Sequence, residues 1–143
     1  MTVLVVDDSK VTRKIITRAL EELGIQKIDE AEDGTVAWRM FRRGNYDFVI
    51  TDWNMPNMCG LDLVESIRMI DEEVPVLMIT TEAEKQRVVT ALQAGVTDYL
   101  LKPFEDSHLQ EKIFKHLGTE PTDASIPETE APETETSETQ EVG

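Results

Sequence analysis

The chain has 143 residues, a formal net charge of −15 and a single cysteine. This length matches one domain, because domains most often contain about 100–150 residues. One cysteine excludes an internal disulfide, and no apolar run reaches the roughly 18 residues that a membrane-spanning helix needs. We therefore expect a cytoplasmic protein with no membrane insertion.

The negative charge is concentrated near the C-terminal end of the chain. Residues 119–143 contain eight of the 29 acidic residues and no Lys or Arg, so residues 1–118 carry 21 acidic and 14 basic residues. Thr, Glu and Pro dominate residues 119–143, where Ile126 and Val142 are the large aliphatic side chains. Such a segment buries too little apolar surface to offset its ordering entropy. We expect one domain over 1–118 and a disordered acidic tail over 119–143, neither with the basic face that nucleic-acid binding requires.

Short apolar runs alternate with amphipathic stretches over residues 1–118. The run Val3 to Val6 is typical of a strand buried on both faces. Ser9 predicts the N-cap of a helix that stops at Gly24, and the apolar stripe expected on it comprises Val11, Ile15, Ala19 and Leu23. In chain order we expect strands at 3–6, 26–31, 48–52, 76–80 and 97–101, and helices at 10–23, 34–43, 61–70, 82–94 and 105–117. Five such units in a row predict an α/β fold, with a parallel sheet covered by helices on both faces.

Three carboxylates follow the first and third expected strands. Asp7 and Asp8 come after the first strand, and Asp52 ends the third. In an open parallel sheet, ligands bind beyond the carboxyl ends of the strands where the strand order reverses, so the three groups share one pocket if those strands are neighbours. Two unit charges about 5 Å apart repel by roughly 3 kcal/mol at an effective dielectric constant of about 20. We therefore expect a proton or a cation among them, and oxygen ligands with room for water favour Mg²⁺.

Two further strand ends carry groups that complement a phosphoryl group. Thr80 ends the fourth expected strand with a hydroxyl, and Lys102 follows the fifth with an ammonium. Neither residue alone indicates a site. Together with the carboxylates they supply what phosphoryl binding requires, namely charge neutralisation, a cationic partner for an oxygen and a hydrogen-bond donor.

The motifs V-V-D-D at 5–8, D-W-N-M-P-N-M at 52–58, Thr80 and K-P-F at 102–104 closely resemble those of bacterial two-component response-regulator receiver domains. The resemblance covers residues 1–118 and is closest to the stand-alone chemotaxis regulators of that family. It implies a doubly wound, flavodoxin-like sheet of five parallel strands in the order 2-1-3-4-5, with five helices. It also implies a phosphoacceptor switch that acts only on itself, not a turnover enzyme.

The resemblance assigns roles to individual residues of the site. Asp52 would accept the phosphoryl group from a sensor histidine kinase, and Lys102 and Thr80 would hold its oxygens. The bond between Lys102 and Pro103 would be cis. The Mg²⁺ ligands would be Asp8, Asp52, the backbone carbonyl of Asn54 and, through water, Asp7.

The resemblance also implies a switch that links Asp52 to an output surface. Thr80 would move toward the phosphoryl group, and Tyr99 would turn into the space that Thr80 leaves. The surface formed by the fourth helix, the fifth strand and the fifth helix would then change shape. A partner would contact it at Val88, Tyr99 and Lys112.

The sequence leaves the output pathway open. The match at 52–58 favours chemotaxis, with a flagellar motor switch as the partner of a monomer, and the alternative is a stand-alone receiver acting as a phosphorelay intermediate or adaptor. A phosphohydrolase with an aspartyl-phosphate intermediate is disfavoured, because haloacid-dehalogenase-like enzymes carry a D-x-D motif after the first strand. A flavin-binding domain is disfavoured because the carboxylates would repel the FMN phosphate.

A few residues depart from the pattern or stand outside it. Cys59 replaces the Asp or small polar residue usual in the family, and Thr81 replaces Ala or Gly, so the lifetime of the phosphoryl group is not predicted. His108 and His116 have no acidic or cysteine partner at ligand spacing, and we expect surface histidines. Trp53, next to Asp52, should report on the pocket by its fluorescence.

Overall fold

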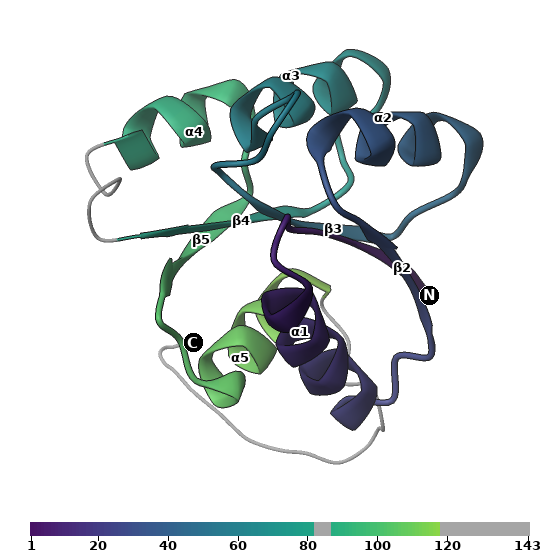
Figure 1. Cartoon of the computed structure of the whole chain (residues 1–143), viewed down its shortest axis with the longest axis vertical. Helices are drawn as coiled ribbons and strands as arrows, with labels where there is room; N and C mark the ends of the chain where they lie inside the picture. Colours follow the sequence, from purple (N-terminus) through teal and green to yellow (C-terminus); the bar gives the residue numbers. More distant parts are fainter. Residues whose placement is uncertain (82–86, 118–143) are drawn as a thin grey trace, which may run out of the picture.

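The computed structural model describes residues 1–81 and 87–117 (Figure 1). The expected tail 119–143 and the first residues of the expected helix 82–94 lie outside the described residues. The strands are β1 (Thr2–Val6), β2 (Lys27–Ala31), β3 (Phe48–Asp52), β4 (Val76–Thr81) and β5 (Asp98–Lys102). The helices are α1 (Lys10–Glu22), α2 (Gly34–Arg43), α3 (Gly60–Ile70), α4 (Val88–Ala94) and α5 (Asp106–Leu117).

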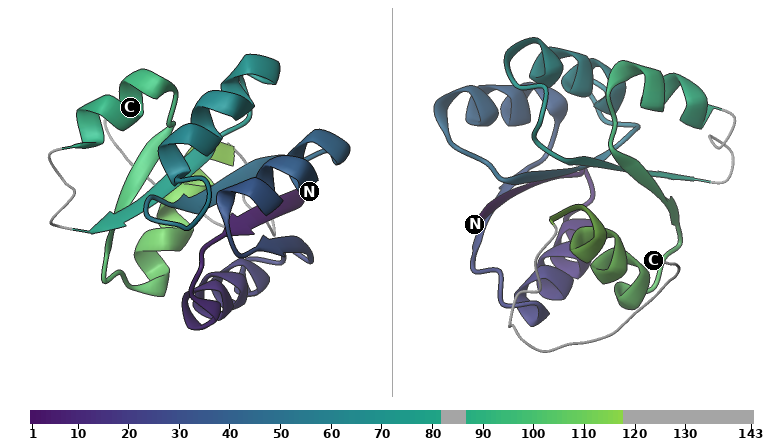
Figure 2. Two further views of the ribbon diagram at one scale, coloured as in Figure 1. Left: turned by 45° about the horizontal axis from the view of Figure 1, so that its top comes forward. Right: turned by 180° about the vertical axis from the view of Figure 1, so that it is seen from behind.

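The five strands form one parallel sheet in the order β2-β1-β3-β4-β5. Helices α2, α3 and α4 cover one face of the sheet, and α1 and α5 cover the other (Figures 1 and 2). The predicted strand order, pairing and layer arrangement are therefore confirmed. Because β1 and β3 are neighbours, with Val6 paired to Thr51, their carboxyl ends meet at one edge of the sheet.

Each face of the sheet has its own apolar core. Leu4 and Val6 of β1 pack with buried residues of α2 and α3, whereas Val3 and Val5 pack with those of α1 and α5. Successive side chains of a strand point to opposite faces, so a central strand covered on both sides must be apolar at every position. This requirement explains the continuous apolar runs that identify β1, β3 and β4 in the sequence.

Helix α1 has the expected N-cap, since the Ser9 hydroxyl oxygen accepts the Thr12 N–H at 3.3 Å. The expected apolar stripe is wrong in its first half: Val11 is 69% and Ile15 is 39% exposed, and the buried residues of the helix are Ile16, Ala19 and Leu20. Ile16 lies about 100° round the helix from Ile15. Both stripes are apolar in the sequence, and packing against the sheet and α5 selects between them.

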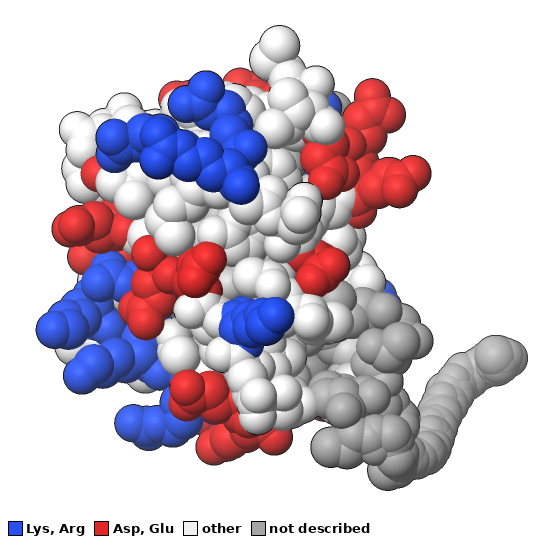
Figure 3. All heavy atoms as spheres, turned by 90° about the vertical axis from the view of Figure 1, so that its right-hand side faces the viewer, with Lys and Arg blue, Asp and Glu red and all other residues white. Residues whose placement is uncertain are grey.

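Strand β2 is the edge strand that its polar sequence predicts. Lys27, Asp29 and Glu30 are exposed along it. Figure 3, which faces this side of the molecule, shows Lys and Arg side chains interspersed with Asp and Glu. Charged side chains on an edge strand disfavour pairing with the sheet of another molecule.

The helices of the described residues do not include one with the length and apolar character of a membrane span.

Candidate active site

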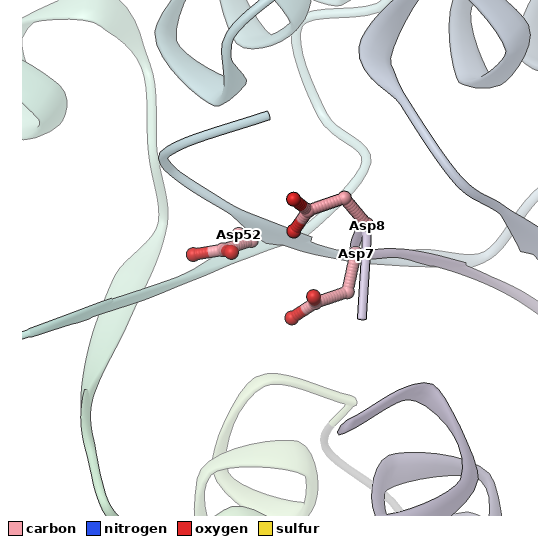
Figure 4. Close-up of side chains that lie close together, drawn as sticks. All are labelled: Asp7, Asp8 and Asp52. Atoms are coloured by element: carbon pink, nitrogen blue, oxygen red, sulfur yellow. The ribbon is translucent and has the colours of Figure 1, made fainter. Parts of the chain in front are cut away.

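The carboxylates of Asp7, Asp8 and Asp52 converge at the carboxyl ends of β1 and β3 (Figure 4). One oxygen of each lies within 4.8 Å of the others. Asp7 and Asp52 are buried, whereas Asp8 is exposed. The site is therefore open to solvent on the side of Asp8 and closed beneath Asp7 and Asp52.

The turn after β1 fixes Asp7 by its backbone and its side chain. Asp7 Oδ1 accepts the Ser9 N–H at 2.8 Å, and the Asp7 carbonyl accepts a hydrogen bond from Arg13 Nη1 at 2.6 Å. Arg13 also pairs with Glu30 at 3.0 Å, which ties α1 to the end of β2. Nothing in the sequence distinguishes Arg13 from the other basic residues of α1, so its role is visible only in the structure.

Asp52 is the last residue of β3 and is 7% exposed. Its Oδ1 accepts the Trp53 N–H at 2.8 Å. The start of α3 comes so close that a Cβ on Gly60 would lie 2.2 Å from the carbonyl oxygen of Asp52, and only glycine leaves enough space there. Asp52 is thus held by the strand behind it and by the helix that follows.

Lys102 connects the buried carboxylates from the end of β5. Its Nζ lies 3.3 Å from Asp7 Oδ2 and 3.3 Å from Asp52 Oδ2. The bond between Lys102 and Pro103 is cis, as the resemblance implies. The structure therefore brings the carboxylates and the ammonium predicted from separate strand ends into one site.

The site has fewer positive than negative groups, and this imbalance affects the pKa values of its residues. Burial raises the pKa of Asp52, and the neighbouring Asp7 raises it further, while Lys102 opposes both effects. Burial lowers the pKa of Lys102, but Asp52 and Asp7 outweigh it and raise that pKa above its ordinary value. With one ammonium for three carboxylates, the ionised site has an excess of negative charge. Oxygen ligands with one exposed member, Asp8, fit a hydrated Mg²⁺ well.

The remaining residues of the predicted site lie around this cluster. Thr80 is buried on β4, one position beyond Ile79, which pairs with Asp52. Asn54 follows Asp52 by two residues in the loop that leads to α3. Tyr99 is paired with Met78 in the sheet, so it lies on the same face as Thr80 and diagonal to it.

The residues of the predicted partner surface differ in their exposure. Val88 is only 9% exposed, because it lies with Ala91 on the inner face of α4, whereas Val89 is 63% exposed. Lys112 lies over the Tyr99 ring, with its Nζ 5.6 Å from the ring centroid. Of the two valines of α4, Val89 is the exposed one in this conformation, and contact of a partner with Val88 stays a prediction.

Asp98, at the start of β5, is a residue that sequence reasoning missed. Its carboxylate lies 3.1 Å from Lys112 Nζ and 2.7 Å from His116 Nε2. We expected His116 at the surface because no acidic residue stands at ligand spacing from it, but its side chain is only 16% exposed and its acidic partner comes from a different element. Burial favours the neutral form of Asp98, but hydrogen bonds from His116, the Tyr99 N–H and Lys112 outweigh it and lower the pKa of this carboxyl.

A family match and similar known proteins point to the same family. Residues 3–114 match the family described as response regulator receiver domain. The chain is 46% identical over 117 residues to chemotaxis protein CheY-3 of Vibrio cholerae serotype O1, covering 80% of this chain and 90% of that protein. It is also 46% identical over 117 residues to chemotaxis protein CheY of Pseudomonas aeruginosa, covering 80% of this chain and 94% of the relative.

Solved structures agree with the sequence matches. The chemotaxis response regulator CheY4 of Vibrio cholerae superposes with a TM-score of 0.74 at 32% identity, covering 80% of this chain and 96% of that one. The receiver domain of a sensor histidine kinase from Pseudomonas aeruginosa, solved with a magnesium ion in its active site cleft, gives a TM-score of 0.75 at 31% identity, with 82% and 98% covered. The chain belongs to the response regulator receiver domain family.

Proposed function

We propose that this receiver domain is a Mg²⁺-dependent switch in which Asp52 accepts a phosphoryl group from a sensor histidine kinase. The observation that carries the proposal is the meeting of three carboxylates from two strand ends with the Lys102 ammonium from a third. A carboxylate cluster with too little positive charge is stabilised by a bound cation, and the cation can in turn bind a phosphoryl group. A solved relative described with magnesium in its active site cleft supports the choice of metal.

The chemistry needs little more than positioning. A carboxylate oxygen of Asp52 attacks the phosphorus atom of the phosphohistidine, the P–N bond breaks, and its electron pair stays on the imidazole nitrogen. The product is an acyl phosphate on Asp52. Lys102 Nζ, already beside Asp52, would pair with a phosphoryl oxygen, and the Thr80 hydroxyl would donate to another. Mg²⁺ held by Asp8, Asp52 and the Asn54 carbonyl, with Asp7 acting through water, would supply the remaining positive charge.

We further propose that the phosphorylated domain signals in chemotaxis, through the surface formed by α4, β5 and α5. The names of two curated relatives support this pathway. Tyr99 and Lys112 lie together on this surface, and Tyr99 shares a face of the sheet with Thr80. A flagellar motor switch protein is the expected partner. The alternative is a phosphorelay intermediate or adaptor in another pathway. Capture of the partner by the phosphorylated protein would distinguish the two roles.

The phosphoacceptor is tested with acetyl phosphate and Mg²⁺. Intact mass spectrometry should show one added phosphoryl group that hydroxide removes, and Asp52→Asn should show none. Asp47→Asn is the matched control, because Asp47 precedes the same strand and its carboxylate accepts the Thr2 N–H at 2.8 Å, away from the site. Undiminished phosphorylation of Asp52→Asn would refute the assignment.

A further inference from the structure

The loop of residues 53–59, between β3 and α3, is tied to the beginning of α2. Asn57 Nδ2 donates a hydrogen bond to Asp33 Oδ2 at 2.9 Å. Asp33 is a buried residue and the N-cap of α2, and its other oxygen, Oδ1, accepts the Val36 N–H at 2.8 Å. One carboxylate therefore joins the start of α2 to the loop that follows Asp52.

The loop is strained at the same residue. Asn57 has a φ of 70° and is the non-glycine residue with a positive φ in the described part of the chain. The Met58 N–H donates to the Pro56 carbonyl at 2.7 Å, so Asn57 is the centre of a three-residue γ-turn. A γ-turn with positive φ is rare and strained, and such strain persists only where the surroundings over-determine it. The bond to Asp33 is one such constraint.

Gly34 provides a second constraint on the loop. A Cβ at this position would lie 2.2 Å from the Met58 carbonyl oxygen, so no other residue fits without moving the loop. The opposite side of the loop is fixed by α3, where the Gly60 N–H donates to the Trp53 carbonyl at 2.8 Å. Asn54 thus lies in a short loop held at α3 and at α2.

We propose that Asp33, Gly34 and Asn57 form a loop clamp that positions the Asn54 carbonyl and so sets the Mg²⁺ affinity of the carboxylate cluster. The inference rests on the proposed function, and it makes all three positioning residues, because they act through the backbone of the loop. A carbonyl ligand contributes to Mg²⁺ binding only if it is held in near-octahedral geometry, which Mg²⁺ demands more strictly than Ca²⁺ does. A rigid, strained loop supplies that geometry before the metal arrives.

Two substitutions break the clamp while sparing the other role of each residue. Asp33→Ser keeps an oxygen for the N-cap of α2 and removes the acceptor for Asn57. Asn57→Gly keeps the positive φ without steric cost and removes the donor. Both variants and their combination are titrated with MgCl₂ in isothermal calorimetry, and their unfolding is followed in urea without metal.

Each single variant should bind Mg²⁺ roughly 3- to 30-fold more weakly. Loss of an outer-shell partner of a metal ligand typically weakens metal binding about 10- to 100-fold, and the clamp acts less directly. The double variant should bind no more weakly than the weaker single one, because both lose one shared contact. Asn57→Gly should be at least as stable to urea as wild type, since relief of strain offsets the lost hydrogen bond. Weaker binding without lower stability is a combination that a merely structural role would not produce.

Asp71→Ser is the matched control. Asp71 lies at the far end of α3, and its Oδ1 accepts the N–H groups of Glu73 and Val74 at 2.9 and 3.0 Å. This variant also replaces a carboxylate by a hydroxyl, but far from the loop, so it should keep its Mg²⁺ affinity. Unchanged affinity in both Asp33→Ser and Asn57→Gly, with normal binding by wild type, would overturn the clamp alone. A wild-type protein that binds no Mg²⁺ would overturn the proposed function and the clamp with it.

Discussion

Replacing Asp52 with Asn should stabilise the metal-free protein at neutral pH and abolish its stabilisation by Mg²⁺. Burial and Asp7 raise the pKa of Asp52, so the folded protein holds this proton more tightly than the unfolded chain does. An ionised carboxyl with a raised pKa costs stability. The loss develops as the pH rises from the ordinary pKa of 3.8 through the higher pKa of the folded protein. Asn keeps the shape of Asp and carries no charge.

The magnitude follows from the geometry of the cluster. With one oxygen of Asp7 and one of Asp52 within 4.8 Å of each other, their repulsion is at least about 3.5 kcal/mol at an effective dielectric constant of about 20. Lys102 lies 3.3 Å from both carboxylates, and by the same relation its attraction to Asp52, about 5 kcal/mol, is large enough to offset this repulsion. The burial cost of an ionised Asp52 remains, and we expect Asp52→Asn to recover on the order of 1–2 kcal/mol of it.

The assay is urea unfolding of both proteins with EDTA and with saturating MgCl₂. Without metal the variant should be more stable at pH 7, and its advantage should shrink as the pH falls and Asp52 in wild type takes up a proton. At a Mg²⁺ concentration of about 100 times the dissociation constant, wild type should gain about 2.7 kcal/mol and the variant little, so their order reverses. A variant that is less stable than wild type in EDTA, or that gains as much from Mg²⁺, would refute the reasoning.

Three other predictions concern the output surface and the tail. Asp98→Asn should destabilise the protein at pH 7, because the pKa of Asp98 is lower in the folded protein than in the unfolded chain and so contributes stability above the unfolded pKa. In acid titrations followed by circular dichroism, the difference in stability between variant and wild type should shrink as the pH falls below about 4. A constant difference would contradict this origin. Beryllofluoride with Mg²⁺, a phosphoryl mimic, should shift the ring resonances of Tyr99 in NMR spectra of wild type and less in Thr80→Ala; equal shifts would break the proposed link. Removal of residues 119–143 should leave the melting temperature within a few degrees of wild type in scanning calorimetry, and a larger drop would mean that the tail packs on the domain.

The fold was predictable because local and global requirements agree along most of the chain. Val3 to Val6 has to be apolar throughout in a strand covered on both faces, and Ser9 and Gly24 mark the ends of the helix that follows. The face of α1 was not predictable, because its sequence carries two apolar stripes. Only packing against α5 and the sheet decides that Ile16, and not Ile15, is buried.

The centre of the site was predictable for a topological reason. Parallel strands bring their carboxyl ends to one edge, so Asp7, Asp52 and Lys102 needed only the correct strand order to meet. The supporting contacts were not, because they join elements far apart in sequence. Asn57 and Asp33 are 24 residues apart, and an isolated Asn or Asp in a loop gives no signal of its partner.

Strand β5 brings the site and the output surface into a single short element. Lys102, at its end, contacts Asp52, and Asp98, at its start, holds Lys112 and His116 of α5. Tyr99, next to Asp98, lies under the Lys112 ammonium. If a phosphoryl group on Asp52 draws Lys102 away from Asp7, the change acts on the same five-residue strand that carries the output side chains. A shift of β5 against α5 would therefore act on the output side chains directly, beside the proposed movement of Thr80 and Tyr99.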